Sequence, residues 1–330
     1  MLEGDGILKS FIINENDANQ RLDKFIVKSL PGLPAALMYK YIRLKRIKVN
    51  GKRSEISTRL IAGDLVEMYI NDEFFGQPES RYDFLSASKN IDILYEDENI
   101  MLLDKSVGLL AHPDENEYVD TLITRVKRYL YENGSYNPAD ESSFTPALVN
   151  RIDRNTGGIV IAAKTAEALR ILNDKMKNRE IKKYYLCVIQ GVMPQKSGQL
   201  EGWLTKDEEN NKVKVYNSPR EGSKEIKTKY TVLAAKNDLS LLEVELLTGR
   251  THQIRAHFAY IGHPLVGDGK YGINAKNRAL GYKKQFLYSY KLVFDFKADA
   301  GCLEYLNHRT FEVKNVWFAV NFPENILAGV

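Results

Sequence analysis

The feature that most constrains this chain is the break in hydrophobic periodicity between Asn71 and Asn90. This stretch is rich in Asp, Glu, Ser, Gly and Pro, a composition typical of a linker. At 330 residues and 44% apolar content, the chain can bury one sizeable core and a small second one. We therefore expect an N-terminal extension over residues 1–19, a small domain over 20–72, a linker over 73–90 and a large domain over 91–330.

Charge is distributed unevenly between the two domains. The segment from Gln20 to Ala62 holds eleven Lys or Arg and two acids, Asp23 and Glu55, so its net charge is +9. The whole chain carries +4, which leaves −5 for the remainder. Clustered Lys and Arg bind polyanions by displacing condensed counterions. The small domain is therefore a candidate nucleic-acid-binding module, and the alternative from charge alone is a solvated basic face.

The hydrophobic pattern of the small domain predicts two short helices packed on a small sheet. Apolar residues recur at helical spacing over residues 22–30 and again, after a proline-containing break, over residues 37–42. Alternation over 47–49, a hairpin turn at 50–51 and the apolar run 65–70 predict strands. This packing would bring several cations close to one surface: Lys40, Arg43, Lys45, Arg46 and Lys52.

The large domain has the pattern of a sheet-dominated α+β fold. Helical spacing appears mainly over residues 169–176. Apolar runs with strand character cover residues 91–95, 100–103, 159–163, 184–192, 230–234, 239–247 and 286–296. Because the connections between them are short, we expect an antiparallel or mixed sheet rather than repeated right-handed crossovers.

Polar groups gather at two places in the large domain. The first is the loop 150–158, in which Asp153 lies between Arg151 and Arg154 and precedes the strand expected over 159–163. A nearby positive charge favours the ionised form of a carboxylate, so this loop would hold a charged Asp153 at the mouth of the sheet. Taken alone, the same residues could equally cap a turn.

The second place is the segment 247–257. It contains Arg250, His252, Arg255 and His257, groups that can hold phosphates, ribose hydroxyls or a buried carboxylate. Zinc binding is a competing interpretation, but the histidines are five residues apart, which is not the one-face spacing of a helical zinc pair, and Arg255 would repel a cation. A purely structural role, joining a helix to the sheet, is the third interpretation.

The cysteines and the apolar runs indicate where the protein acts. Cys187 and Cys302 are the two cysteines, and they match neither a secreted disulfide scaffold nor a zinc cluster. No charged start is followed by an apolar signal core, and no apolar run approaches the roughly 20 residues that span a bilayer. We expect a soluble cytoplasmic protein without a membrane partner.

In the small domain, residues 21–23, 47–51 and 62–64 look like an S4 RNA-binding domain. This resemblance places the S4 domain at residues 20–72 and implies contact with RNA. It says nothing about chemistry, because function depends on individual sites rather than on a fold.

The large domain resembles the RluA/RluC/RluD-type pseudouridine synthases. Residues 151–158 are similar to the family's Arg-Leu-Asp-x-x-Thr-Ser-Gly loop, and residues 248–264 to its second signature. The resemblance implies a catalytic domain over 91–330, of the α+β class and built on a mixed, mainly antiparallel sheet. It implies the isomerisation of selected uridines in structured RNA to pseudouridine, with no cofactor, no metal and no obligate protein partner.

The resemblance also implies roles for single residues. Asp153 corresponds to the essential aspartate, which either attacks C1′ of the ribose or removes a C2′ proton. Tyr185 matches the tyrosine that stacks on the uracil and assists removal of the C5 proton, and Arg255 matches the arginine that pairs with the aspartate. The residues expected to contact RNA are Arg151, Leu287, Arg250 and His252 and, in the basic domain, Arg43, Lys45 and Arg46.

Some positions depart from the family pattern. Asn150 stands where the family commonly has His, Ile152 where it has Leu, and Gly157 where it has Ser. Ser106 replaces a proline, and Tyr288 replaces a histidine. None of these changes removes a catalytic group, so they bear on local packing and substrate preference rather than on activity.

Residues 38–39 and 43–45 resemble the RluC-like members, which favours large-subunit ribosomal RNA as the substrate; transfer RNA is the alternative.

Two functions of other classes compete with this interpretation. One is a non-catalytic RNA-binding factor of ribosome assembly, which the presence of all three catalytic residues opposes. The other is a metal-dependent hydrolase that would use His252, His257 and Asp268.

Overall fold

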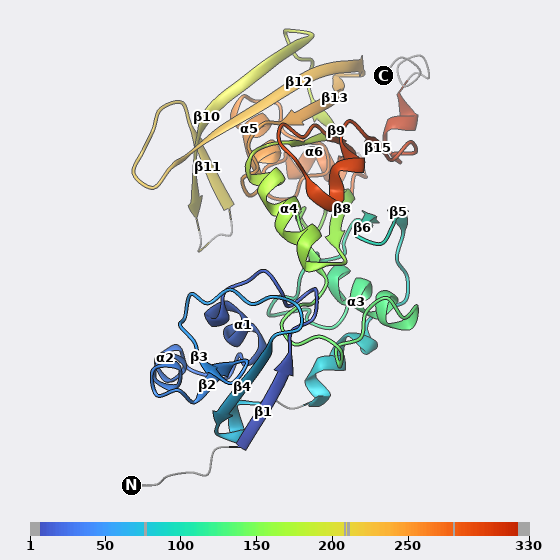
Figure 1. Cartoon of the computed structure of the whole chain (residues 1–330). Helices are drawn as coiled ribbons and strands as arrows, with labels where there is room; N and C mark the ends of the chain where they lie inside the picture. The colour runs from blue at the N-terminus through green and yellow to red at the C-terminus, as the bar shows by residue number, and fades with distance from the viewer. Residues whose placement is uncertain (1–6, 76–77, 208, 210–211, 280, 323–330) are drawn as a thin grey trace.

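Two β-sheets organise the chain, a small one near the N-terminus and a large one in the remainder (Figure 1). The computed structural model describes residues 7–75, 78–207, 209, 212–279 and 281–322. The small sheet has the strand order β1-β4-β2-β3. Its domain consists of β1 (Ile7–Ile12), α1 (Leu22–Ser29), α2 (Ala35–Arg43), β2 (Ile47–Val49), β3 (Lys52–Arg53) and β4 (Leu65–Ile70).

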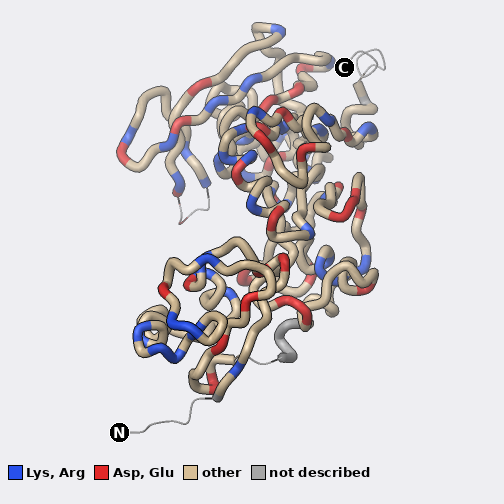
Figure 2. Tube along the Cα trace, viewed as in Figure 1, with Lys and Arg blue, Asp and Glu red and all other residues tan. Residues whose placement is uncertain are grey.

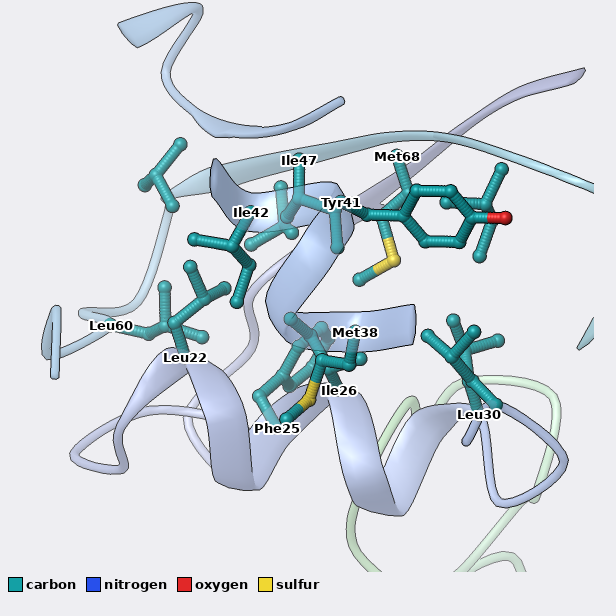
Figure 3. Packing of buried hydrophobic residues seen from close by; sticks show 14 of the residues in the cluster. Leu22, Phe25, Ile26, Leu30, Met38, Tyr41, Ile42, Ile47, Leu60 and Met68 are labelled. Carbon is teal, nitrogen blue, oxygen red and sulfur yellow. The ribbon is translucent and has the colours of Figure 1, made fainter. Parts of the chain in front are cut away.

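The two helices predicted from hydrophobic spacing are confirmed. Leu22, Phe25 and Ile26 are fully buried along one face of α1, at the three- and four-residue separations of a helical stripe (Figure 3). Met38 of α2 and Met68 of β4 belong to the same buried cluster. The small domain therefore has a core of its own, formed by both helices and the sheet.

Two domain boundaries differ from the expectation. Residues 1–19 are expected to be an extension, yet β1 pairs antiparallel with β4 along its whole length and is an edge strand of the small sheet. The expected linker, residues 73–90, contains the 3-10 helix η2 (Pro78–Ser86), and Phe84 within it is buried against Tyr131. Local composition misses both features, because strand pairing and aromatic packing join residues that are far apart in the sequence.

The large sheet is mixed and mainly antiparallel, as predicted. Eleven described strands form it, and the parallel pair among them joins β14 to β8. The main path runs β11-β10-β12-β13-β9-β14-β8-β6-β5, while β7 pairs with β8 and β15 with β14. The strands are β5 (Ile93–Glu96), β6 (Ile100–Lys105), β7 (Ala147–Leu148), β8 (Gly157–Ala163), β9 (Ile181–Gln190), β10 (Ser197–Asp207), β11 (Lys212–Tyr216), β12 (Lys224–Lys236), β13 (Leu239–Leu246), β14 (Leu287–Phe294) and β15 (Thr310–Glu312).

The large domain contains more helices than the sequence predicted. The pattern over residues 169–176 is part of α4 (Ala166–Lys177), whereas α3 (Leu122–Glu132) and α5 (Gln253–Tyr260) were not predicted. Among the described helices, none has the length and apolar character needed to cross a membrane. The shorter helical segments are η1 (Asp72–Phe74), α6 (Asn274–Ala279), η3 (Gly301–Leu306) and η4 (Ala319–Asn321).

Strand β8 is buried on both faces, and this fixes the loop that precedes it. Ile159 and Ile161 pack in the same cluster as residues of α4, whereas the alternate residues Val160 and Ala162 pack with residues of α3. Because successive side chains of a strand point to opposite faces, the two helices enclose β8 from both sides. The loop that carries Asp153 therefore ends at a rigid part of the sheet.

Polar contacts join the small domain to the large one. Asp17 is fully buried and accepts hydrogen bonds from Ser143 N at 2.8 Å and from Ser143 Oγ at 2.6 Å. Asn16 donates to Glu141 Oε1 at 2.7 Å and accepts from the backbone N of Ala166, in the first turn of α4, at 3.0 Å. We call this set of contacts the domain dock. It consists of directional hydrogen bonds, which fix an orientation.

Two departures from the family pattern fit each other in the structure. Tyr288 of β14 lies beside Gly157 at the start of β8, and a Cβ atom on residue 157 would stand 2.5 Å from Tyr288 Cε2. The ring cannot move aside freely, because its hydroxyl donates to Asp104 Oδ1 at 2.6 Å. A serine at residue 157 would therefore crowd the ring of Tyr288, and the glycine avoids this contact.

We predict that Gly157→Ser lowers the free energy of unfolding by about 1–3 kcal/mol, the usual cost of overpacking a filled site. Tyr288→His shortens the opposing side chain, so the double variant should be more stable than Gly157→Ser alone. Urea unfolding of both single variants and of the double variant measures this coupling. Simple addition of the two single losses in the double variant would mean that the two positions are independent.

Candidate active site

A cleft with a cavity volume of about 320 Å³ lies where the loop before β8, strand β9, the start of β14 and the N-terminus of α5 meet. Segments far apart in the sequence contribute to its walls. All of the residues predicted from the large domain to act in catalysis or to contact RNA line this cleft: Arg151, Asp153, Tyr185, Arg250, His252, Arg255 and Leu287.

Arg255 lies at the centre of the site and bridges two carboxylates. Its Nη1 donates to Asp153 Oδ2 at 2.7 Å, while its Nε and Nη2 donate to the two oxygens of Asp268 at 2.7 and 3.0 Å. The bidentate pair with Asp268 fixes the plane of the guanidinium, so the remaining donor is aimed at Asp153. The Asp153 side chain is 27% exposed, which leaves the carboxylate accessible to a substrate.

Asp268 was considered in the sequence only as a metal ligand, and its environment indicates a different role. It is fully buried and accepts further hydrogen bonds from the backbone N atoms of Lys270 and Tyr271. Burial alone would raise the pKa of the Asp268 carboxyl, but the hydrogen bonds and charge of Arg255 outweigh this effect and lower that pKa. Asp268 is therefore a charged anchor for Arg255.

The loop of Asp153 is held from behind by Lys105. This side chain is completely buried at the end of β6, and its Nζ donates to the carbonyl oxygens of Ser106, Leu109 and Arg154 at 3.0, 2.7 and 3.1 Å. Burial lowers the pKa of Lys105 to about 7, against the opposing effect of the Asp153 charge. The three bonds tie the residue after Asp153 to the turn that follows β6.

Tyr185 and Leu287 form the apolar side of the cleft. They are 6% and 4% exposed and pack in one cluster with Ile254 of α5. Burial raises the pKa of Tyr185 to about 12, so the phenol stays protonated at neutral pH. Its aromatic ring forms part of the cleft wall. Tyr184 packs on the opposite side of β9 in another cluster, as strand alternation predicts.

His252 lies beside Asp153 as an uncharged group. It caps the N-terminus of α5 in the left-handed conformation, with φ of 52°. Its Nε2 is 3.8 Å from Asp153 Oδ2, and its Nδ1 is 2.9 Å from the Tyr271 hydroxyl, whose oxygen accepts from Val213 N at 2.8 Å. Burial lowers the pKa of His252. The imidazole therefore contributes a hydrogen-bonding group, and not a second cation, next to Asp153.

The remaining cations of the cleft differ in exposure. Arg151 and Arg250 are exposed at its edge, whereas Lys183 is half-buried inside it. Lys183 was not predicted as a site residue. It stands two positions before Tyr185 on β9, and this spacing places both side chains on one face of the strand, which is the signal that could have identified it.

The predicted basic residues of the small domain lie away from the catalytic cleft. Arg43 ends α2 and lines a separate cavity with Tyr39 and Arg53. Lys45 and Arg46 follow in the turn between α2 and β2, where Lys and Arg gather along the chain trace (Figure 2). The structure therefore separates a basic surface from the cleft that holds Asp153.

The side chains proposed for a metal-dependent hydrolase are engaged elsewhere. His257 is buried with its Nδ1 3.0 Å from Thr228 Oγ1, and both oxygens of Asp268 accept from Arg255. Within the described part of the chain, no group of three or more His, Cys, Asp or Glu side chains could hold a metal ion.

Two family models match the sequence, one in each domain. The model described as RNA pseudouridylate synthase matches residues 99–260, and the S4 domain model matches residues 20–66. The human RNA pseudouridylate synthase domain containing 4, a solved structure, has a TM-score of 0.53 at 19% identity, over 69% of this chain and 90% of that one. This likeness is one of fold.

Curated relatives match over almost the whole length. An uncharacterised RNA pseudouridine synthase of Mycoplasma genitalium is 35% identical over 294 residues, which cover 87% of this chain and 90% of that protein. The ribosomal large subunit pseudouridine synthase C of Vibrio parahaemolyticus is 28% identical over 330 residues, covering 96% of this chain and 95% of the relative. Family models match both domains, and the Mycoplasma genitalium protein is 35% identical over 87% of the chain. The chain therefore belongs to the RNA pseudouridine synthases.

Proposed function

We propose that this RNA pseudouridine synthase modifies selected uridines of large-subunit ribosomal RNA, with Asp153 as its essential carboxylate. The 2.7 Å contact between Arg255 and Asp153, in a cleft that also contains Tyr185, is the observation that supports the catalytic assignment. The name of the Vibrio relative supports the choice of RNA. Two unpaired cysteines fit a reaction in the reducing cytoplasm.

The target nucleotide has to leave its helix before it can react. A uridine stacked in RNA keeps its glycosidic bond out of reach of a protein carboxylate, so the base must be flipped at a cost of a few kcal/mol. Phosphate contacts to the basic domain and stacking of the uracil on Tyr185 offset this cost. The two surfaces therefore have separate tasks, one in holding the RNA and the other in holding the base.

In the cleft, Asp153 begins the reaction while Arg255 fixes its orientation. The carboxylate either attacks C1′ or removes the C2′ proton, and the N1 to C1′ bond breaks. The uracil turns and C5 bonds to C1′. This step displaces the carboxylate in the first route, and in the second the C2′ proton is returned. C5 then gives up its proton to water and N1 takes one up, so the product is an isomer of the substrate. Tyr185, in the wall of the same cleft, is assigned to stacking on the uracil.

The target is identified by mapping pseudouridines through chemical labelling in wild-type and deletion strains. Loss of a site in large-subunit ribosomal RNA upon deletion is the expected result. Loss confined to transfer RNA would change the substrate but keep the chemistry. If every site persists, the non-catalytic assembly factor becomes the better interpretation.

We predict that Asp153→Asn abolishes turnover and leaves RNA affinity within about tenfold, because phosphate contacts carry most of the binding. Single-turnover assays by mass spectrometry and filter binding measure the two effects. Asp238→Asn is the matched control, since that carboxylate is 71% exposed and forms a surface ion pair with Lys276. Conversion of uridine by the Asp153 variant would refute the assignment.

We also predict that replacing Arg43, Lys45 and Arg46 by Gln weakens RNA binding and reduces its salt dependence. If each cation neutralises one phosphate, the slope of log K against log salt should fall by about 2–3. The single-turnover rate at saturating RNA should not change, because the cleft is intact. Binding titrations at several salt concentrations provide the measurement.

The control for this variant removes three exposed lysines of the large domain instead: Lys177, Lys236 and Lys314. It loses the same charge, so it separates an effect of position from an effect of net charge. Equal losses of affinity in the two triple variants would contradict the assignment of the basic surface.

A further inference from the structure

Lys183 is a cation inside the catalytic cleft to which the reaction described above gives no task. It lies on β9 two residues before Tyr185, and both side chains line the cavity that contains Asp153. A Cβ atom on Gly249, across the cleft, would stand 3.6 Å from Lys183 Nζ. The ammonium group is therefore close to the loop that leads into α5, beside the position proposed for the uracil.

The charge of Lys183 has no carboxylate partner among the described residues. Its Nζ contacts Met176 Sδ at 3.7 Å, and a thioether is a weak acceptor. Lys182, on the opposite face of the same strand, forms an ion pair with Asp295 at 2.8 Å. Burial lowers the pKa of Lys183, and no neighbouring charge opposes this effect.

A half-buried ammonium without a counter-charge costs free energy, and an anion that enters the cleft would recover it. The carboxylate of Asp153 is not that anion, because it is held by Arg255. Before the glycosidic bond breaks, uracil and ribose are neutral, so the phosphodiester groups are the anions that a flipped nucleotide brings into the cleft. A lysine binds a phosphate as a point charge, which suits a group whose orientation varies as the uracil turns.

We propose that Lys183 binds the backbone phosphate next to the target uridine and thereby holds the flipped nucleotide in the cleft. The inference rests on the proposed function and extends it to a phosphate site inside the cleft. It differs from the basic surface of the small domain, which binds RNA at a distance from the reacting sugar. It also gives the cleft a means to hold the ribose while the base is detached.

The test uses the full-length chain and short RNAs that contain the mapped target uridine. In two of these RNAs, the linkage on the 5′ or the 3′ side of that uridine is an uncharged methylphosphonate. With the all-phosphate RNA, Lys183→Met should lower kcat/KM by about 10- to 100-fold, the effect of losing one charge-assisted hydrogen bond. With one of the methylphosphonate RNAs, wild type and variant should differ by less than about twofold.

Lys182→Met is the matched control, because it removes the same group from the other face of β9. It should behave as wild type on all three RNAs. Lys183→Arg keeps the charge and should retain most of the activity on the all-phosphate RNA. Lys183→Gln replaces the Met variant in the same comparison if the latter does not fold.

The outcomes separate the inference from the function on which it rests. An equal loss for the Met or Gln variant on all three RNAs would mean that Lys183 supports the protein and does not contact phosphate. Wild-type kinetics for the variant would likewise overturn the proposal. If the wild-type chain forms no pseudouridine in the all-phosphate RNA, the proposed function fails, and this inference fails with it.

Discussion

The site depends on one guanidinium that two carboxylates share. Arg255 donates two hydrogen bonds to Asp268 and a third to Asp153. A buried ion pair of this kind adds little net stability, yet the loss of one partner is costly because a charge is left uncompensated. The ion pair instead fixes geometry, because the bidentate bond to the fully buried Asp268 holds the guanidinium of Arg255 in one orientation. Asp153 is consequently oriented before any substrate arrives.

The large sheet provides the rigid frame for that geometry. Gly158 shows how close the packing is: its φ is +112°, and a Cβ atom there would stand 2.2 Å from the carbonyl oxygen of Ser289 on β14. Lys105 ties Arg154, the residue after Asp153, to the turn that follows β6 through three carbonyl groups. The backbone that follows Asp153 is thus held at two points, Arg154 and Gly158, which fixes the place from which the loop presents its carboxylate.

The sequence predicted the elements that depend on local interactions and missed those that depend on residues far apart in the chain. Helices with one apolar face, such as α1, and the Asn50-Gly51 turn, with φ of 52° and 71°, are encoded locally and were predicted. Helix α5 was not, because six of its eight residues are buried, from Gln253 to Phe258, and a helix enclosed on all sides lacks an amphipathic pattern. The edge strand β1 has its partner more than 50 residues away, so no local pattern reveals it.

The same distinction applies to the candidate site. Asp153, Tyr185 and Arg255 were identified by resemblance to a family, and the fold brings them together in one cleft. The role of the anchor Asp268 was not predicted, and the sequence suggested it only as a ligand in the competing metal-dependent hydrolase. A sequence shows a carboxylate but not the guanidinium that pairs with it. Lys183 was missed for the converse reason. Lys183 has no carboxylate partner among the described residues, and only the arrangement of its neighbours in the fold shows this.

The domain dock joins the domain with the basic surface, to which we assign RNA binding, to the domain with the cleft, to which we assign the flipped base. A typical hydrogen bond contributes only about 1 kcal/mol net, since water competes for both partners, so the bonds of Asp17 and Asn16 add limited stability. Their directionality matters more, because a buried carboxylate that loses its donors costs about 1–3 kcal/mol or more. The dock therefore tolerates one orientation of the basic surface relative to the cleft. If RNA binds to the basic surface and reacts at Asp153, as proposed, the distance between the two surfaces limits which uridine of a bound RNA can reach that carboxylate.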